Sequence, residues 1–264
     1  MQYRRRALSS SFEAKNEGTI IDNYMTIVAL EDGVYAKLDN NPLEYCIDGS
    51  GDWVVLPKNT NTPSIDKGQT ISFRGECTIS SYSGIGHFTI KGECNLMGNC
   101  NSLLFGDNPS DDLTGKTYAF SNVFRNNLIV EVADDFLPAT ILTDACYSYM
   151  FQACDLLVKA PKLPAMTLAN SCYGNMFEDC DSLEVAPDLP AQILSPYCYV
   201  CMFQYCKNLK YVKALFLSLS SGQYCTDYWL YDVSSRGTFV KSKDASWNVS
   251  GASGIPSAWD IVLV

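Results

Sequence analysis

A repeat of 26 residues limits what this 264-residue chain can fold into more than any other feature of the sequence. Three segments align without gaps, starting at Cys146, Cys172 and Cys198. They read CYSYMFQACDLLVKAPKLPA, CYGNMFEDCDSLEVAPDLPA and CYVCMFQYCKNLKYVKALFL. A chain with a fixed period of this length stacks its repeats, because each repeat buries its apolar face only against its neighbours.

Weaker copies flank the three clear repeats. Upstream, Phe124 lies 27 residues before Phe151, and downstream, Trp229 lies 27 residues after Met202. Divergent outer copies are typical of capping repeats, because a terminal repeat exposes one face to water. The array is therefore predicted to span about residues 95–240.

Within one repeat, the apolar residues follow first a helical and then an extended pattern. Leu168, Cys172 and Met176 are spaced four residues apart, which predicts one stripe of a short helix. Residues 183–186 predict a short strand, and Pro187 ends it, because proline lacks the backbone N–H that strand pairing needs. One helix and one strand per repeat predict an α+β solenoid, with parallel strands on one wall and helices on the other.

The N-terminal part of the chain has a different pattern. Residues 26–38 alternate around a Glu-Asp-Gly turn, which predicts a hairpin, and more short alternating segments follow. These segments predict a small all-β domain that precedes the repeats. We therefore divide the chain into a basic N-terminal tail (1–20), a small all-β domain (21–95), the repeats (96–223) and a C-terminal capping segment (224–264).

Charge and the length of the apolar runs argue against two classes of partner. The chain has 19 basic and 29 acidic residues and a net charge of −10, so it lacks the positive charge that drives nucleic-acid binding. No apolar run approaches the roughly 18–20 residues that cross a bilayer, so we expect no membrane span. The single histidine, His87, excludes any mechanism that needs two.

Three consecutive arginines, Arg4, Arg5 and Arg6, form the densest positive cluster. Polar residues follow them instead of the roughly 7–15 apolar residues of an export signal, so we expect no signal peptide. The cluster predicts either a solvated tail or an attachment point for an anionic or acidic partner.

The repeat pattern C-Y-x-x-M-F-x-x-C-x-x-L-x-x-A-P-x-L-P-A resembles the BspA-like leucine-rich repeats of gut and oral bacteria, and of phages of Bacteroides-type hosts. The tail GTFVKSKDASWNVSGASGIPSAW resembles the closing segment of many such arrays. The resemblance implies a leucine-rich-repeat fold, a recognition or structural role at a surface, and no enzymatic activity.

The resemblance also implies a location and partners. Because no export signal is expected, release of a phage particle by lysis supplies the route out of the cell. We therefore expect a virion protein, for decoration, for a head fibre or for tail-associated adhesion to a host-surface protein or glycan. The other virion proteins are partners, and family analogy allows a homo-oligomer. The alternatives are a bacterial cell-surface adhesin and a cytoplasmic protein-interaction scaffold.

The twelve cysteines suggest core packing, a metal site or disulfides, and the sequence favours the first. Cys198 and Cys201 have a zinc-like spacing, but no second such pair and no histidine pair accompanies them. None of the phosphate-binding, dinucleotide-binding, zinc-protease or serine-hydrolase motifs occurs. We therefore predict no catalytic residue, no cofactor and no metal ligand.

The strand wall is the predicted binding surface. If the repeated Leu and Ala positions point inward, the two residues between them point outward in every repeat. An exposed row of apolar and charged side chains is typical of a face that binds a protein or glycan, although a merely solvated face has the same pattern. The predicted face consists of Glu131, Val132, Val158, Lys159, Glu184, Val185, Lys210 and Tyr211.

Overall fold

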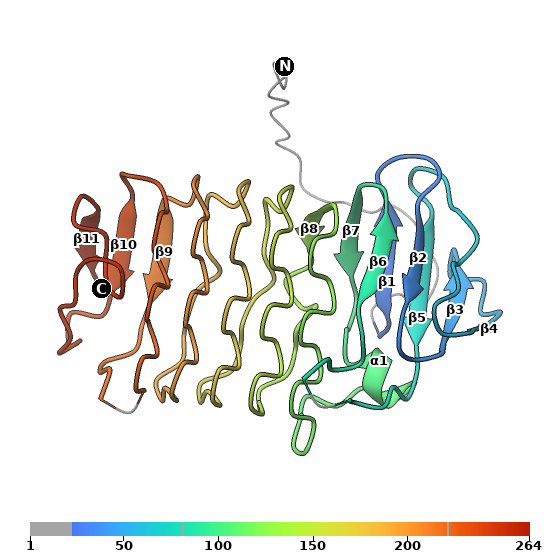
Figure 1. Ribbon diagram of the computed structural model, residues 1–264, viewed down its shortest axis with the longest axis horizontal. Coiled ribbons are helices and arrows are strands. Elements are labelled where there is room, and N and C mark those ends of the chain that lie inside the picture. The colour runs from blue at the N-terminus through green and yellow to red at the C-terminus, as the bar shows by residue number, and fades with distance from the viewer. Residues whose placement is uncertain (1–22, 81, 221) are drawn as a thin grey trace.

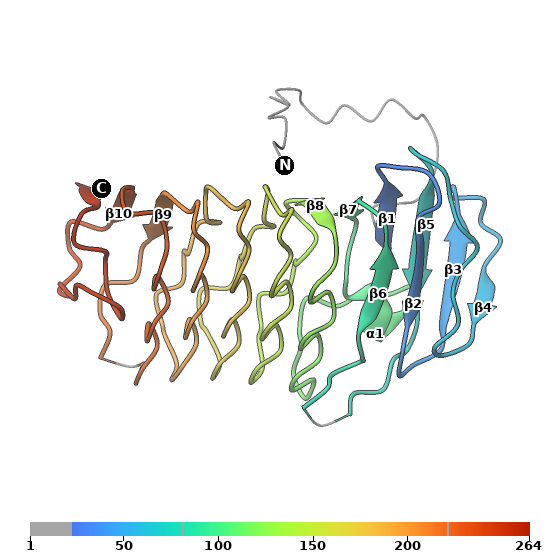
Figure 2. The same cartoon turned by 45° about the horizontal axis from the view of Figure 1, so that its top comes forward.

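The computed structural model describes residues 23–80, 82–220 and 222–264 and has an elongated shape (Figure 1). The N-terminal β-strands lie at one end, and the repeats follow in chain order toward the other end, where the C-terminus lies (Figures 1 and 2). One continuous hydrophobic core runs through both parts.

The N-terminal part consists of two antiparallel layers. The larger sheet has the order β4-β3-β5-β1-β7-β8, and the smaller one pairs β2 with β6. The rings of Phe73 from β5 and Phe88 from β6 meet between the layers, with centroids 5.2 Å apart. The strands are β1 (Met25–Ala29), β2 (Tyr35–Leu38), β3 (Leu43–Ile47), β4 (Val54–Leu56), β5 (Thr70–Arg74), β6 (Phe88–Lys91) and β7 (Cys94–Met97).

In each repeat, the segment predicted to be a helix is a ribbon of consecutive β-turns. The N–H of Cys146 donates to the carbonyl oxygen of Thr143, three residues earlier, at 3.2 Å. The next N–H, that of Tyr147, donates to the carbonyl oxygen of Cys172 in the following repeat at 3.0 Å. This alternation continues along the ribbon, whereas an α-helix bonds every N–H four residues back within the same segment. The ribbons therefore join neighbouring repeats through backbone hydrogen bonds.

The ribbon places every fourth residue in the left-handed region, with φ between 51° and 64°. A right-handed helix contains no such residue. The spacing of four apolar residues that predicted a helix is therefore the period of the turn ribbon. The left-handed residues are Tyr118, Asn122, Asn126, Ala145, Tyr149, Ala153, Ser171, Asn175, Asp179, Tyr197, Cys201, Tyr205, Tyr224, Tyr228 and Asp232.

The predicted α+β leucine-rich-repeat solenoid is wrong. The only helix in the described ranges is α1 (Ser102–Phe105), a single turn outside the ribbons, so no helical wall covers the repeats. The structure is instead nearly all β, with several small sheets. Its remaining strands are β8 (Ile129–Val132), β9 (Tyr211–Ala214), β10 (Thr238–Lys241) and β11 (Asp260–Leu263).

Identical side chains stack in columns through the core of the repeats. The rings of Phe124, Phe151, Phe177 and Phe203 are nearly parallel, with neighbouring centroids 5.7–5.8 Å apart. Offset parallel rings at this separation add to the free energy of apolar burial. The columns explain why the same residue types recur at one interval in the sequence.

The opposite wall contains short extended segments. Strand β8 continues the large N-terminal sheet by parallel pairing with β7, and β9, β10 and β11 form a parallel sheet at the C-terminal end (Figure 1). Between them, single parallel bridges join Glu131 to Lys159 and Val185 to Tyr211. Pro161 and Pro187 follow the bridged residues of the middle repeats and lack the N–H that longer pairing requires.

A substitution in the methionine column tests the stack. Met176 is fully buried between the equivalent Met150 and Met202, so Met176→Ala leaves a cavity in the core. We expect the free energy of unfolding to fall by about 2–5 kcal/mol, measured by urea denaturation. Met166→Ala is the control, because Met166 is 50% exposed, and we expect a change below about 0.5 kcal/mol. Equal losses for the two variants would contradict the placement of Met176 in the core.

Candidate functional site

The cysteines are core residues. All twelve are free thiols, and eleven of them are buried. Burial raises the pKa of Cys146 and of Cys154 to about 12, so neither thiol supplies a nucleophilic thiolate near neutral pH. The interpretation of these cysteines as packing residues is confirmed.

One cysteine column also has a hydrogen-bonding role. The Sγ of Cys154 donates to the carbonyl oxygen of Phe124 in the preceding repeat, at 3.2 Å. The Sγ of Cys180 donates in the same way to the carbonyl oxygen of Phe151, at 3.2 Å. A thiol in this column therefore fills a small volume and also satisfies a buried carbonyl group, which an alanine side chain cannot do.

The Cys198-x-x-Cys201 pair divides between two environments. Cys198 lies in a buried column, whereas Cys201 occupies a left-handed position of the ribbon and is only partly buried. Within the described residues, no group of three or more His, Cys, Asp or Glu side chains is arranged to hold a metal ion. The zinc-like spacing thus follows from the repeat itself.

The predicted strand face is exposed over most of its length. Val158 is 49% exposed and Val185 is 51% exposed. Salt bridges flank them: Lys159 Nζ lies 3.1 Å from Asp134 Oδ1, and Lys210 Nζ lies 2.6 Å from Glu184 Oε2. Because these pairs are open to solvent, each stabilises the fold by about 1 kcal/mol or less.

The inclusion of Val132 in this face is wrong. Strand β8 contains a bulge, in which Cys94 pairs with Ile129 while Asn95 pairs with Glu131, so Val130 is an additional residue. A shift of one residue turns side chains to the opposite face of a strand. Val132 is therefore fully buried, while Glu131 stays partly exposed.

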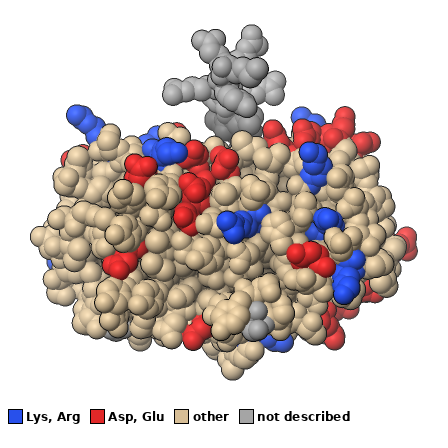
Figure 3. Space-filling model, viewed as in Figure 1, with Lys and Arg blue, Asp and Glu red and all other residues tan. Residues whose placement is uncertain are grey.

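The strand face offers a surface instead of a deep pocket. Its one hollow among the described residues is lined by Leu96, Glu131 and Lys159 and has a volume of about 120 Å³. Pockets that enclose small ligands measure roughly 300–1,000 Å³. In the view of Figure 3, acidic and basic side chains are interspersed, and a large area over the repeats carries no charge. A partner of this face would bind by area and by hydrogen bonds.

Sequence analysis missed a cluster of tyrosines on the turn ribbons of the last two repeats. The rings of Tyr197 and Tyr224 stack with centroids 5.4 Å apart, and the ring of Tyr231 meets those of Tyr205 and Tyr228 at 5.9 and 5.7 Å. We call these five residues the tyrosine patch. Their spacings of 26 and 27 residues carried the signal, but a helical reading of the ribbon gave no reason to place them on one surface.

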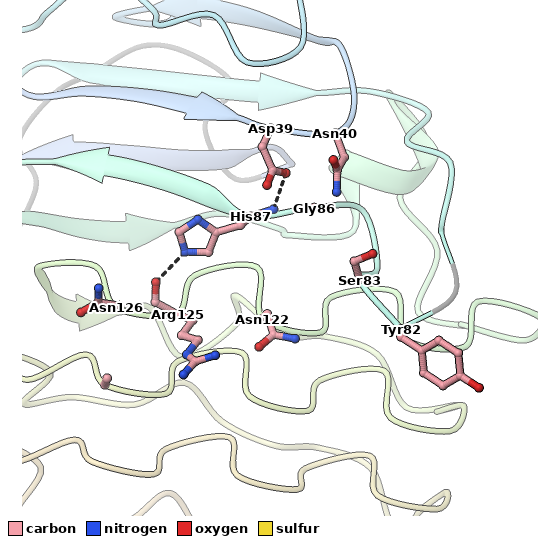
Figure 4. Close-up of a pocket in the computed structure, with 10 residues that line it drawn as sticks. Asp39, Asn40, Tyr82, Ser83, Gly86, His87, Asn122, Arg125 and Asn126 are labelled. Carbon is pink, nitrogen blue, oxygen red and sulfur yellow. Dashed lines mark hydrogen bonds between the residues drawn. The ribbon is translucent and has the colours of Figure 1, made fainter.

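A polar groove lies between the N-terminal strands and the first repeat and has a volume of about 640 Å³ (Figure 4). The loop that follows β2 contributes Asp39, the segment before β6 contributes His87, and the first turn ribbon contributes Arg125. His87 joins the two walls: its backbone N–H donates to Asp39 Oδ1 at 2.8 Å, and its Nε2 lies 2.7 Å from the carbonyl oxygen of Arg125. Because a carbonyl oxygen only accepts, Nε2 carries a proton.

Two further expectations concern the ends of the chain and the membrane. Arg4, Arg5 and Arg6, the predicted attachment cluster, lie outside the described residues. No helix within the described ranges has the length and apolar character needed to cross a bilayer.

Comparison of the chain with protein-family models, with curated proteins and with solved structures finds no match. The resemblance to BspA-like proteins therefore rests on the repeat motif and the tail segment alone. Inferences about function have to come from the surfaces described above.

Alkylation tests the assignment of the cysteines. We expect iodoacetamide at pH 8 to label native protein mainly at Cys201, because the other thiols are buried, including Cys225, whose pKa is lowered by a hydrogen bond with Cys198. The pKa of Cys201 is itself raised by partial burial and by Glu178, so its labelling rate should still be rising above pH 9. Mass spectrometry of peptides locates the label, and Cys201→Ser is the control. Rapid labelling of Cys146 in folded protein would contradict this assignment.

Proposed function

We propose that this protein is a non-enzymatic recognition and structural protein that binds a macromolecule through side chains displayed on stacked repeats. The tyrosine patch carries the proposal. Its residues are well exposed, with Tyr197 at 43% and Tyr224 and Tyr228 at 50%. Tyrosine gives a large, rigid contact area with a polar tip, and it is enriched at recognition surfaces for that reason.

The backbone does not require tyrosine at these positions. A left-handed conformation disfavours bulky side chains and favours Gly, Asn and Asp. Earlier repeats contain such smaller residues at equivalent ribbon positions, with Ser171 equivalent to Tyr224, Asn175 equivalent to Tyr228, and Asp179 equivalent to Tyr205. The four aromatic left-handed residues of the last two repeats therefore oppose a local preference, which supports a role at the surface.

The strand face supports the same proposal as a second contact area. Val158, Val185 and the partly buried Tyr211 lie in neighbouring repeats and alternate with the lysines and glutamate of the salt bridges. Apolar contacts surrounded by exposed charges are a common composition for protein interfaces. Both surfaces are wide and nearly flat, which favours a protein or a long glycan over a small metabolite.

The proposed setting is a phage virion, in decoration, in a head fibre or in tail-associated adhesion, and its support is the resemblance of the repeat motif. Immunogold electron microscopy of a producing culture, with antibodies against the full chain, tests it. Gold on released particles is the expected result. Gold on the surface of intact cells would instead favour a bacterial adhesin, and gold confined to the cell interior would favour a cytoplasmic scaffold.

Exchanges between equivalent positions of the repeats test the tyrosine patch. The triple variant Tyr205→Asp, Tyr224→Ser and Tyr228→Asn installs residues that the ribbon already contains at the same positions. We expect at least a tenfold loss of binding of labelled protein to intact Bacteroides-type cells, measured by flow cytometry. The melting temperature should be unchanged or slightly higher, because the new side chains suit a left-handed backbone.

The matched control is Tyr149→Asn, which makes the same exchange at the position equivalent to Tyr228 but three repeats earlier, outside the patch. It should bind cells like the natural protein. Full binding by the triple variant, or an equal loss in the control, would show that the patch is not the recognition surface.

A further inference from the structure

The polar groove between the N-terminal strands and the first repeat is held open by both of its walls. The backbone N–H of Phe88 donates to the carbonyl oxygen of Val123 at 2.8 Å, and the buried Asn127 side chain donates to the carbonyl oxygen of Phe88 at 2.8 Å. Asn127 also accepts from the N–H of Ile90 at 2.7 Å. The walls therefore form one hydrogen-bonded unit, and a ligand needs no rearrangement of the backbone to enter.

The side chains on the groove have donors and acceptors to spare. Among the described residues, the guanidinium of Arg125 has no salt bridge or hydrogen bond, and Asp39 uses only one carboxylate oxygen, for His87. With a proton on Nε2, the neutral His87 ring presents Nδ1 as an acceptor. Asn122 and Asn126 add amides from the ribbon, and Figure 4 shows these side chains around one opening.

The stack does not account for Arg125. The equivalent positions of the next repeats contain Gln152 and Glu178, which hydrogen-bond to each other from one repeat to the next. Arg125 makes no such contact within the described residues, although Gln152 follows it in the same column. The first repeat therefore differs from the others at the position where it borders the groove.

We propose that this groove binds one or two sugar units of a glycan. Its volume suits a small ligand, and its lining is polar, which disfavours a lipid or another apolar molecule. Hydroxyl groups both donate and accept, so they match a mixture of amides, a carboxylate, a guanidinium and an imidazole. Asp39 repels the phosphate that Arg125 alone would attract. The ring of Tyr82, 75% exposed at the rim, gives a flat apolar surface for the C–H face of a sugar.

This site is separate from the tyrosine patch, so it stands or fails independently of the proposed function. The full chain is tested on an array of bacterial and host oligosaccharides. Ligands are then confirmed by saturation-transfer NMR with free hexoses, N-acetylhexosamines and uronic acids. We expect at least one class of saccharide to bind, and Arg125→Ala and Asn122→Ala each to weaken that binding by tenfold or more.

Asn175→Ala is the matched control for Asn122→Ala. Both asparagines occupy the same left-handed position, with φ of 56° and 61°, and each donates one side-chain hydrogen bond on the ribbon, so the two variants should lose equal stability. Only Asn122 borders the groove, so Asn175→Ala should retain saccharide binding.

Three outcomes would overturn the proposal. The first is an absence of saccharide binding by the full chain. The second is saccharide binding that both groove variants retain in folded form. The third is a response of the groove to inorganic phosphate alone, lost in Arg125→Ala, which would identify an anion site instead.

Discussion

The alternation of backbone N–H groups between two kinds of acceptor is the constraint on which the rest of the structure depends. Along each ribbon, one N–H closes a turn within its own repeat and the next N–H reaches the following repeat. Half of the ribbon's donors are therefore satisfied only when a neighbour is present, and a buried donor without a partner is costly. The N-terminal strands act as a preceding layer, because the N–H of Ile85 donates to the carbonyl oxygen of Ala119 in the first ribbon at 3.0 Å. At the other end, the Trp229 indole N–H donates to the carbonyl oxygen of Gly254 at 2.9 Å, so the C-terminal segment covers the last repeat.

The same alternation determines which side chains the core accepts. Repeats joined by backbone hydrogen bonds lie at one spacing, so each core position meets its own equivalent above and below. Aromatic rings suit this geometry because parallel rings stack with a small offset, as Tyr147, Tyr173 and Tyr199 do at 5.9 and 6.1 Å. Cysteine suits the narrower columns, where its thiol reaches a carbonyl oxygen of the neighbouring repeat. The chain thus uses cysteine for packing and hydrogen bonding, which explains a high cysteine content without a metal ligand set in the described residues.

Sequence alone predicts the period, the core columns and most of the exposed strand face, because all of these follow from the spacing of apolar residues. It fails on the conformation between them. A spacing of four residues fits one stripe of a helix and also fits a ribbon with a left-handed residue at every fourth position. Ser171, Asn175 and Asp179 held the deciding signal, since three residues suited to turns at intervals of four disfavour a helix. The burial of Val132 depends on a bulge in β8, which apolar spacing does not reveal. The groove was beyond prediction, because its walls come from segments that are distant in the chain.

The turn ribbon separates the requirements of folding from those of recognition. Stability depends on the inward columns and on the backbone hydrogen bonds, so the outward left-handed positions need only tolerate φ near 55°. The ribbon positions that border the groove hold Asn and Arg in the first repeat, whereas the last two repeats concentrate tyrosine. Four layers at about 4.8 Å place the two surfaces roughly 20 Å apart on one rigid ribbon. A gain or loss of one repeat would change that distance by a single layer and would leave both surfaces intact. In this architecture, the number of repeats sets the geometry of binding, and the outward side chains set its chemistry.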